Sequence, residues 1–177
     1  MRRIILVFIL TCVYCHFSQA QENYKFSGGF GIGLDYGGLI GTKITYLPAK
    51  WVGLFGSVGL YYYETGYNFG ALLKIPTGKR LTPYLTGMYG TNAEMESKVY
   101  ITRHIYTGAT IGDGLELNSR KNDRVYFNFE LLYPFRVDQF DDDIEKLKSQ
   151  GLTVESTSSP VTVSFGIHLK LGVDYTN

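Results

Sequence analysis

Cysteine is nearly absent from this sequence. The two cysteines among its 177 residues are Cys12 and Cys15, and both lie within the first twenty. If that segment is removed, the remaining chain has no thiol, which excludes disulfide bonds and thiol chemistry.

The chain also lacks a strong charge of either sign. Charged residues make up 19% of it, with 17 Lys and Arg against 16 Asp and Glu. This balance does not favour nucleic acid as a partner, and we expect none. Glycine and aromatic residues are abundant instead, with 21 glycines and 15% aromatics. Together these features favour a β protein.

Long apolar runs are the third absence. After residue 20, no segment approaches the roughly 20 apolar residues that a membrane-spanning helix needs. The first twenty residues contain Arg2 and Arg3, a short apolar run from Ile4 to Val13, and the small-x-small ending Ser18-Gln19-Ala20. This is the anatomy of a secretory signal peptide, so we predict that residues 1–20 are cleaved off.

The rest of the chain alternates between apolar and polar residues. In the stretch VTVSFGIHLKLGVDY, every second residue from Val161 to Tyr175 is apolar. Side chains on a β-strand alternate between two faces, so the pattern predicts a strand with one apolar and one polar face. The same alternation recurs in YKFSGGFGIGLDY, GTKITY, WVGLFGSVGLYYY, YNFGALLKI and RVYFNFELLYPF. It is less regular in LTPYLTGMYGTN, where Tyr84 and Met88 fall on the polar side, and in RHIYTGATIGDGLEL, where Asp113 falls on the apolar side. We therefore predict an all-β fold of about eight strands.

The residue types on the two faces indicate which one meets water. The polar positions hold mostly Gly, Ser, Thr and Asn, whereas the apolar positions hold Phe, Ile, Leu, Val and Tyr. A barrel of eight strands has room inside only for side chains that fill it, and so many large groups would overpack it. The apolar face should therefore point outward, where lipid would accept it. We predict a closed antiparallel up-and-down transmembrane β-barrel over residues 21–177, with a filled polar lumen.

The connections between the predicted strands fit this architecture. Most are short, including DYGG, LPAK, PTGKR, NAEMESK and LNSRKND. Residues 136–159 form the one long connection and contain the helical pattern DDDIEKLKSQG. Outer-membrane barrels have short periplasmic turns and longer external loops, so we place 136–159 outside.

With its signal peptide, alternating strands, TPYLTGMYG segment and aromatic-bearing final strand, the chain resembles small eight-stranded outer-membrane β-barrel proteins. OmpX and the membrane domain of OmpA are of this type, and the resemblance covers roughly residues 22–177. It implies export to the outer membrane of a Gram-negative bacterium, with insertion by the barrel-assembly machinery. Outer-membrane lipids and lipopolysaccharide are the implied surroundings.

Several ionisable residues occupy the alternate strand positions that should face the lumen, which we call the inward parity. We predict that they form a paired polar network there: Lys43, Lys74, Glu116, Arg124, Glu130, His168 and Lys170. Glu130 should have a cationic partner, either Lys170 on the neighbouring strand or Lys43. The alternative interpretation is a proton path or a narrow pore.

Aromatic residues gather at the predicted strand ends, as in the girdles that flank a membrane. The periplasmic set is Tyr46, Trp51 and Tyr175, and the outer set is Tyr36, Tyr62, Tyr67 and Phe135.

Two other sites are candidates for chemistry. His104, with Ser97 and Glu94 nearby, suggests a lipid-hydrolysing Ser–His–acid site, although proximity in sequence is poor evidence for one. The run Asp141–Asp143 with Glu145 suggests a cation or lipopolysaccharide contact, but it lacks the spacing of a calcium loop and is typical of a solvated helix start.

We therefore expect a monomeric, non-catalytic outer-membrane barrel with no cofactor or metal, in a structural or interaction role at the cell surface. The alternatives are an outer-membrane lipid-modifying enzyme and a soluble secreted barrel that binds a small apolar ligand.

Overall fold

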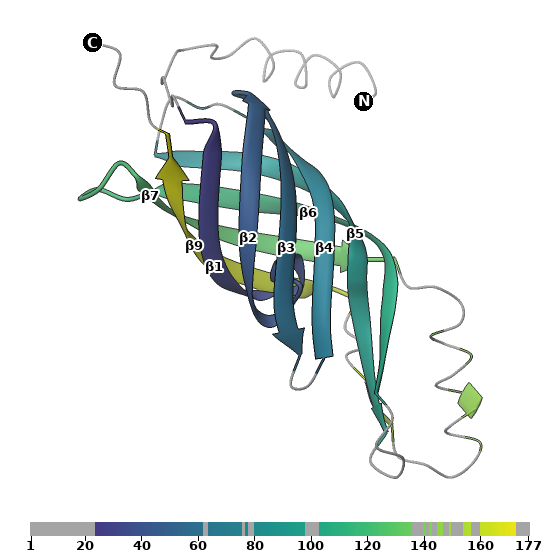
Figure 1. Ribbon diagram of the computed structural model, residues 1–177. Coiled ribbons are helices and arrows are strands. Elements are labelled where there is room, and N and C mark those ends of the chain that lie inside the picture. The colour runs from purple at the N-terminus through teal and green to yellow at the C-terminus, as the bar shows by residue number, and fades with distance from the viewer. Residues whose placement is uncertain are drawn as a thin grey trace, which may run out of the picture.

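Eight antiparallel strands close into a barrel (Figure 1), as the alternating pattern predicts. The computed structural model describes residues 24–61, 64–75, 77, 80–97, 103–135, 140, 142, 145, 146, 149, 154–156 and 160–172. The barrel strands are β1 (Phe26–Gly33), β2 (Gly38–Ala49), β3 (Val52–Tyr61), β4 (Glu64–Lys74), β5 (Leu81–Ser97), β6 (Arg103–Asn118), β7 (Val125–Pro134) and β9 (Thr162–Leu171). A short strand, β8 (Val154–Ser156), pairs with β5, and a 3-10 helix, η1 (Leu34–Tyr36), follows β1.

The strands run up and down, each hydrogen-bonded to its neighbours in the ring. β1 pairs with β9, for example Phe30 with Ile167, and β4 pairs with β5, for example Phe69 with Tyr89. These two pairings complete the circle. Closure satisfies the backbone hydrogen bonds that an open sheet would leave at its edges.

Most large apolar side chains of the strands point outward and most polar ones point inward, as predicted, but Phe55, Leu72 and Leu132 are among the apolar side chains that are buried. Phe30 is 69% exposed and Ile40 is 66% exposed, whereas Lys43 is 2% exposed and Glu130 is fully buried. Along β3 and β9 the exposure alternates residue by residue. The cause is the period of two in strand geometry, combined with a lumen too narrow for bulky groups on every strand.

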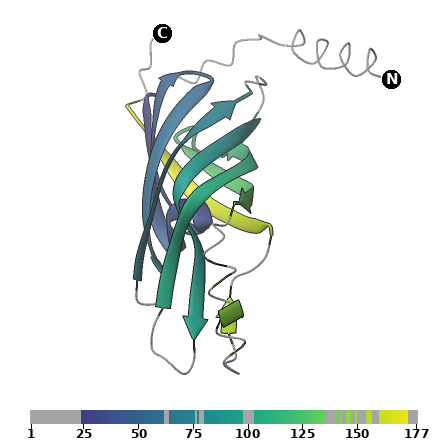
Figure 2. The ribbon, with the colours of Figure 1, turned by 90° about the vertical axis from the view of Figure 1, so that its right-hand side faces the viewer.

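The first strand is shorter than the sequence pattern predicts. Alternation continues through Tyr36, but β1 ends at Gly33 and the chain turns into the barrel as η1. Figures 1 and 2 show this helix inside the ring of strands. Gly33 has a φ of 111° and Gly37 a φ of 78°, values that side chains other than glycine rarely allow. Two glycines therefore permit the chain to leave the barrel wall and return to it.

The hairpin of β5 and β6 is longer than predicted and extends past the other strands (Figure 2). The segment NAEMESK has the composition of a connection, but β5 continues through Ser97, where it pairs with Val154 of β8. The polarity of the segment misled the prediction, because a hairpin beyond the barrel needs no apolar face to form its backbone hydrogen bonds.

Part of the long segment 136–159 packs against the barrel. Its described residues 140, 142, 145, 146 and 149 have helical backbone, in agreement with the helical pattern in the sequence. Phe140 is 1% exposed and meets the ring of Tyr106 edge-on, with centroids 5.1 Å apart. An apolar anchor therefore fastens this segment to β6.

Candidate functional site

Lys43 lies at the centre of a buried ion cluster inside the barrel. Its Nζ donates to Asp35 Oδ2 at 2.7 Å and to Glu130 Oε1 at 2.8 Å. The same Glu130 oxygen accepts a hydrogen bond from Tyr84 Oη at 2.7 Å and one from Asn128 Nδ2 at 3.0 Å. The prediction that Glu130 has a cationic partner is confirmed, because a buried carboxylate needs both a counter-charge and donors.

Of the two lysines that the sequence allows as the partner of Glu130, the structure selects Lys43 and not Lys170. Strand register places Ser164 opposite Glu130, so Lys170 lies six residues further along β9, or about 20 Å. Lys170 Nζ donates instead to Asn118 Oδ1 at 2.6 Å, near the end of the barrel. The alternating pattern places both lysines in the lumen, but only the strand register shows which of them lies near Glu130.

A second ion cluster lies closer to the end where β1 begins. Lys74 Nζ donates to Glu116 Oε2 at 2.6 Å and to Tyr24 Oη at 2.7 Å. Tyr24 Oη donates to the other oxygen of Glu116 at 3.4 Å. The described interior thus holds three lysines and three acids, all nearly excluded from solvent. This balance allows each buried charge to be compensated.

His168 joins the last strand to the inserted turn. Its Nε2 lies 2.6 Å from Tyr36 Oη, which donates to Asn128 Oδ1 at 2.7 Å. The tyrosine hydroxyl has one proton, which it gives to Asn128, so it accepts a hydrogen bond from Nε2 of His168. Its ring also stacks on Tyr126, with centroids 4.8 Å apart and a 12° angle between the planes.

Glycines on the surrounding strands make room for the inserted turn. A Cβ on Gly41 or Gly59 would collide with the carbonyl oxygen of Tyr36, and one on Gly31 or Gly166 would collide with its ring or hydroxyl. The close approach of the inserted turn to the strands thus explains why several inward-facing positions hold glycine. The prediction of Tyr36 as an interface aromatic was wrong, because the turn carries its ring into the lumen, where it is fully buried.

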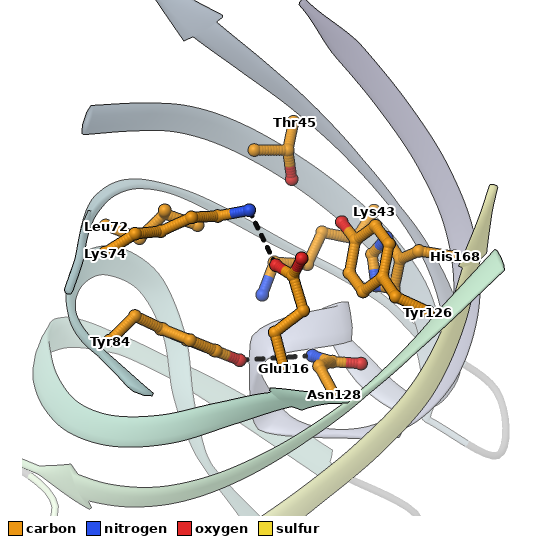
Figure 3. Close-up of a pocket in the computed structure, with 9 residues that line it drawn as sticks. All are labelled: Lys43, Thr45, Leu72, Lys74, Tyr84, Glu116, Tyr126, Asn128 and His168. Carbon is orange, nitrogen blue, oxygen red and sulfur yellow. Dashed lines mark hydrogen bonds and ion pairs between the residues drawn. The ribbon is translucent and has the colours of Figure 1, made fainter. Parts of the chain in front are cut away.

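A cavity of about 10 Å³ lies between the two ion clusters (Figure 3). Its lining residues are Lys43, Thr45, Leu72, Lys74, Tyr84, Glu116, Tyr126, Asn128 and His168. This is room for about one water molecule. Chemically, paired charges cross-link the four strands β2, β4, β6 and β7 and the inserted turn, which fits a structural network better than a pore.

The structure buries six of the seven residues predicted for the lumen network: Lys43, Lys74, Glu116, Glu130, His168 and Lys170. Arg124 is exposed, so its assignment was wrong. It precedes the first residue of β7, and parity assigns no face to a residue in a connection. The predicted set lacks several members of the network, among them Asp35 and Tyr84. Asp35 stands on the inward parity, so this signal was available, whereas Tyr84 stands on the polar side of an irregular pattern.

The predicted interface aromatics divide into three groups. Tyr46, Trp51, Tyr67 and Phe135 are exposed on the outer surface or at its ends, as a girdle requires. Tyr36 is the correction described above. Tyr62 and Tyr175 lie outside the described residues.

Strand register supports the alternative catalytic site only in part. Met95 pairs with His104, whereas Glu94 pairs with Ile105, so Glu94 and His104 occupy positions of opposite parity. Ser97 has the same parity as Met95, so the register does not separate it from His104, and it pairs with Val154 of β8. In the acidic run, Asp142 and Glu145 are exposed, and Asp141 and Asp143 lie outside the described residues. Among the residues that the structure describes, no three His, Cys, Asp or Glu side chains are grouped as metal ligands would be.

Within the same described ranges, no helix has the length and apolarity to cross a membrane. A scan against protein-family models and a search of curated proteins found no match for this chain. The resemblance to small outer-membrane barrels therefore stays a prediction, and what the geometry establishes is an all-β, up-and-down barrel of eight antiparallel strands.

Proposed function

We propose that this protein is an outer-membrane β-barrel protein that is exported through a cleaved signal peptide and has a non-catalytic structural or interaction role at the cell surface. The observation that carries the proposal is the inverted distribution of side chains. Large apolar groups cover the outside of the barrel, and the inside holds paired charges beside a smaller cluster of buried apolar side chains.

The extent of the apolar surface supports lipid as its surroundings. Among the described residues, thirty large apolar side chains are exposed, and they occur on every barrel strand. Soluble monomers rarely expose a continuous apolar patch of more than a few hundred square ångströms. A band of this kind around a closed barrel is typical of strands that face hydrocarbon.

The interior argues against a soluble carrier of an apolar ligand. Such a carrier needs an apolar cavity large enough for its ligand. The described cavity between the ion clusters is about 10 Å³ and has two lysines, a glutamate and a histidine in its lining. A filled, charged lumen also supports a structural role over transport.

The projecting hairpin supports a role in interaction. β5 and β6 extend beyond their neighbours at the end opposite the start of β1, and β8 adds a third strand there (Figure 1). We place this end outside the cell, where it would meet lipopolysaccharide or other surface components. The proposed protein is a monomer inserted by the barrel-assembly machinery.

Two measurements test the proposal. The protein folded in detergent should migrate differently on a denaturing gel before and after boiling, and it should fractionate with membranes. For topology, Glu145→Cys and Lys50→Cys provide a matched pair at opposite ends of the barrel. A membrane-impermeant maleimide should label Glu145→Cys on intact cells and Lys50→Cys only after the outer membrane is opened. Folded protein in the soluble fraction, without detergent, would contradict the membrane assignment. Labelling of Lys50→Cys but not Glu145→Cys on intact cells would contradict the orientation.

A further inference from the structure

A ring of exposed cations surrounds one end of the barrel. These residues, which we call the basic rim, are Lys25, Lys50, Arg80, Arg120, Lys121 and Arg124. Lys25 precedes β1, Lys50 lies between β2 and β3, and Arg80 lies between β4 and β5. The other three lie between β6 and β7.

Strand register places all these connections at the same end. Phe26 pairs with both Tyr46 and Leu171, and Leu81 pairs with Leu117. The rim is therefore the end where β1 begins and β9 ends, opposite the projecting β5–β6 hairpin (Figure 1).

Cations outnumber acids in the connections that form the basic rim. Asp123 is the one acid among the described residues of these same connections. Arg80 Nη2 donates to the carbonyl of Asn118 at 2.6 Å, a contact that orients the guanidinium without neutralising it. The buried acids of the lumen are matched by buried lysines, so they offer the rim no compensation. The described residues at this end of a nearly neutral protein thus have a marked positive charge.

The cations also lie where the apolar belt ends. Three of them are followed directly by an exposed apolar residue: Lys25 by Phe26, Lys50 by Trp51 and Arg80 by Leu81. Trp51 is 58% exposed, and Phe26 stacks on Tyr46 with centroids 4.9 Å apart. If the belt lies in hydrocarbon, a side chain one residue beyond it reaches the level of the lipid headgroups.

We propose that the basic rim binds the headgroups of anionic phospholipids in the leaflet at that end of the barrel. This inference rests on the proposed membrane location and adds a lipid class to it. The arrangement favours a surface over a single ligand, because the cations are distributed over four separate places around the barrel and form no pocket. An anionic leaflet presents negative charge around the full circumference and so matches all four.

The chain contains a built-in reporter for this contact. Trp51 is its single tryptophan and lies beside Lys50 in the rim. Acyl chains brominated near the headgroup quench the fluorescence of tryptophan on contact. For the measurement, residues 21–177 are refolded into vesicles that contain brominated phosphatidylglycerol or brominated phosphatidylcholine. Both leaflets have the same composition, so the direction of insertion does not affect the result.

We expect phosphatidylglycerol to quench Trp51 with a higher association constant than phosphatidylcholine, by up to about fivefold for each cation engaged. The preference should decrease as salt rises, because exposed charges are screened. The double variant Lys25→Gln, Lys50→Gln should bring the two association constants together. The matched control, Arg103→Gln with Lys146→Gln, removes two cations at the other end and should keep the preference.

Each other outcome has a defined meaning. Quenching by neither lipid would overturn the membrane assignment and this inference with it. Equal quenching by both lipids in the unmodified protein would overturn the inference alone, as would an equal loss of preference in both double variants. Sodium phosphate should lower the preference no more than sodium chloride of the same ionic strength; a selective effect would assign the rim to free phosphate and overturn binding to lipid.

Discussion

Tyr36 Oη and His168 Nε2 lie 2.6 Å apart in the lumen, although 132 residues separate them in the chain. The contact ties the turn after the first strand to the last strand, which itself pairs with the first. Closure of this barrel is therefore secured twice, by the backbone ladder in the wall and by side chains across the interior.

The space around the inserted turn should be sensitive to a single methyl group. In Gly41→Ala, the new Cβ would meet the carbonyl oxygen of Tyr36 and lie 2.8 Å from that of Val58. Overpacking of this kind typically costs about 1–3 kcal/mol, so the free energy of unfolding in detergent should fall by that amount. Urea titration followed by tryptophan fluorescence measures it.

Gly87→Ala is the matched control for this change. Gly87 is also in a barrel strand, but a Cβ added there would have only its own chain neighbours within 4 Å. Alanine there should leave the unfolding free energy unchanged or raise it by about 0.4–1 kcal/mol through a less flexible unfolded chain. Equal effects of the two substitutions would argue against the inserted turn.

Glu130 and Lys43 should show strong energetic coupling. Breaking a buried ion pair from one side typically costs about 3–5 kcal/mol, because the other charge is left buried. We expect Glu130→Gln and Lys43→Met each to destabilise the barrel, and the double variant to lose clearly less than the sum. The comparison cycle is Glu130→Gln with Lys170→Met, which should be additive within about 0.5 kcal/mol because the two sites are distant. Additivity in the first cycle would mean that the contact contributes little.

The two faces of β9 can be distinguished by labelling. Ile167 is 46% exposed on the outside, whereas its neighbour His168 is 3% exposed in the lumen. A fluorophore on Ile167→Cys should be quenched by quenchers attached to lipid, whereas the thiol of His168→Cys should resist labelling in the folded protein because the lumen has no room for the reagent. Quenching only at the second position would show that the faces are reversed in the bilayer.

Asp113 is an acidic side chain on the outer surface of the barrel and should be destabilising in lipid. It is exposed on β6 and pairs in register with Leu85 of β5 and Leu131 of β7. A carboxylate facing hydrocarbon is costly, so Asp113→Leu should raise the unfolding free energy in bilayers by about 1–2 kcal/mol. Asp123→Leu, an exposed change outside the belt, should have little effect. A loss of stability in Asp113→Leu would instead indicate that the carboxylate has a favourable contact in the membrane.

The sequence by itself determined the class of fold and the side of each strand that is apolar. Once a strand forms, successive side chains must alternate between its two faces. The alternating pattern therefore assigned Ile167 to the outside and Glu130 to the inside correctly. Most inward positions hold small or polar residues, but the interior also contains a buried apolar cluster that includes Phe55, Leu72 and Leu132. Parity was sufficient for these conclusions because it depends only on local geometry.

Only the tertiary structure decided which inward residues meet and where a strand stops. The partner of Glu130 depends on the register among β2, β7 and β9, and no residue alone encodes a register. The burial of Tyr36 depends on Gly33 and Gly37, which let the chain leave the wall, and on glycines of other strands, which leave space for it. These are contacts between segments far apart in the chain, and they arise only when closure of the barrel brings the segments together.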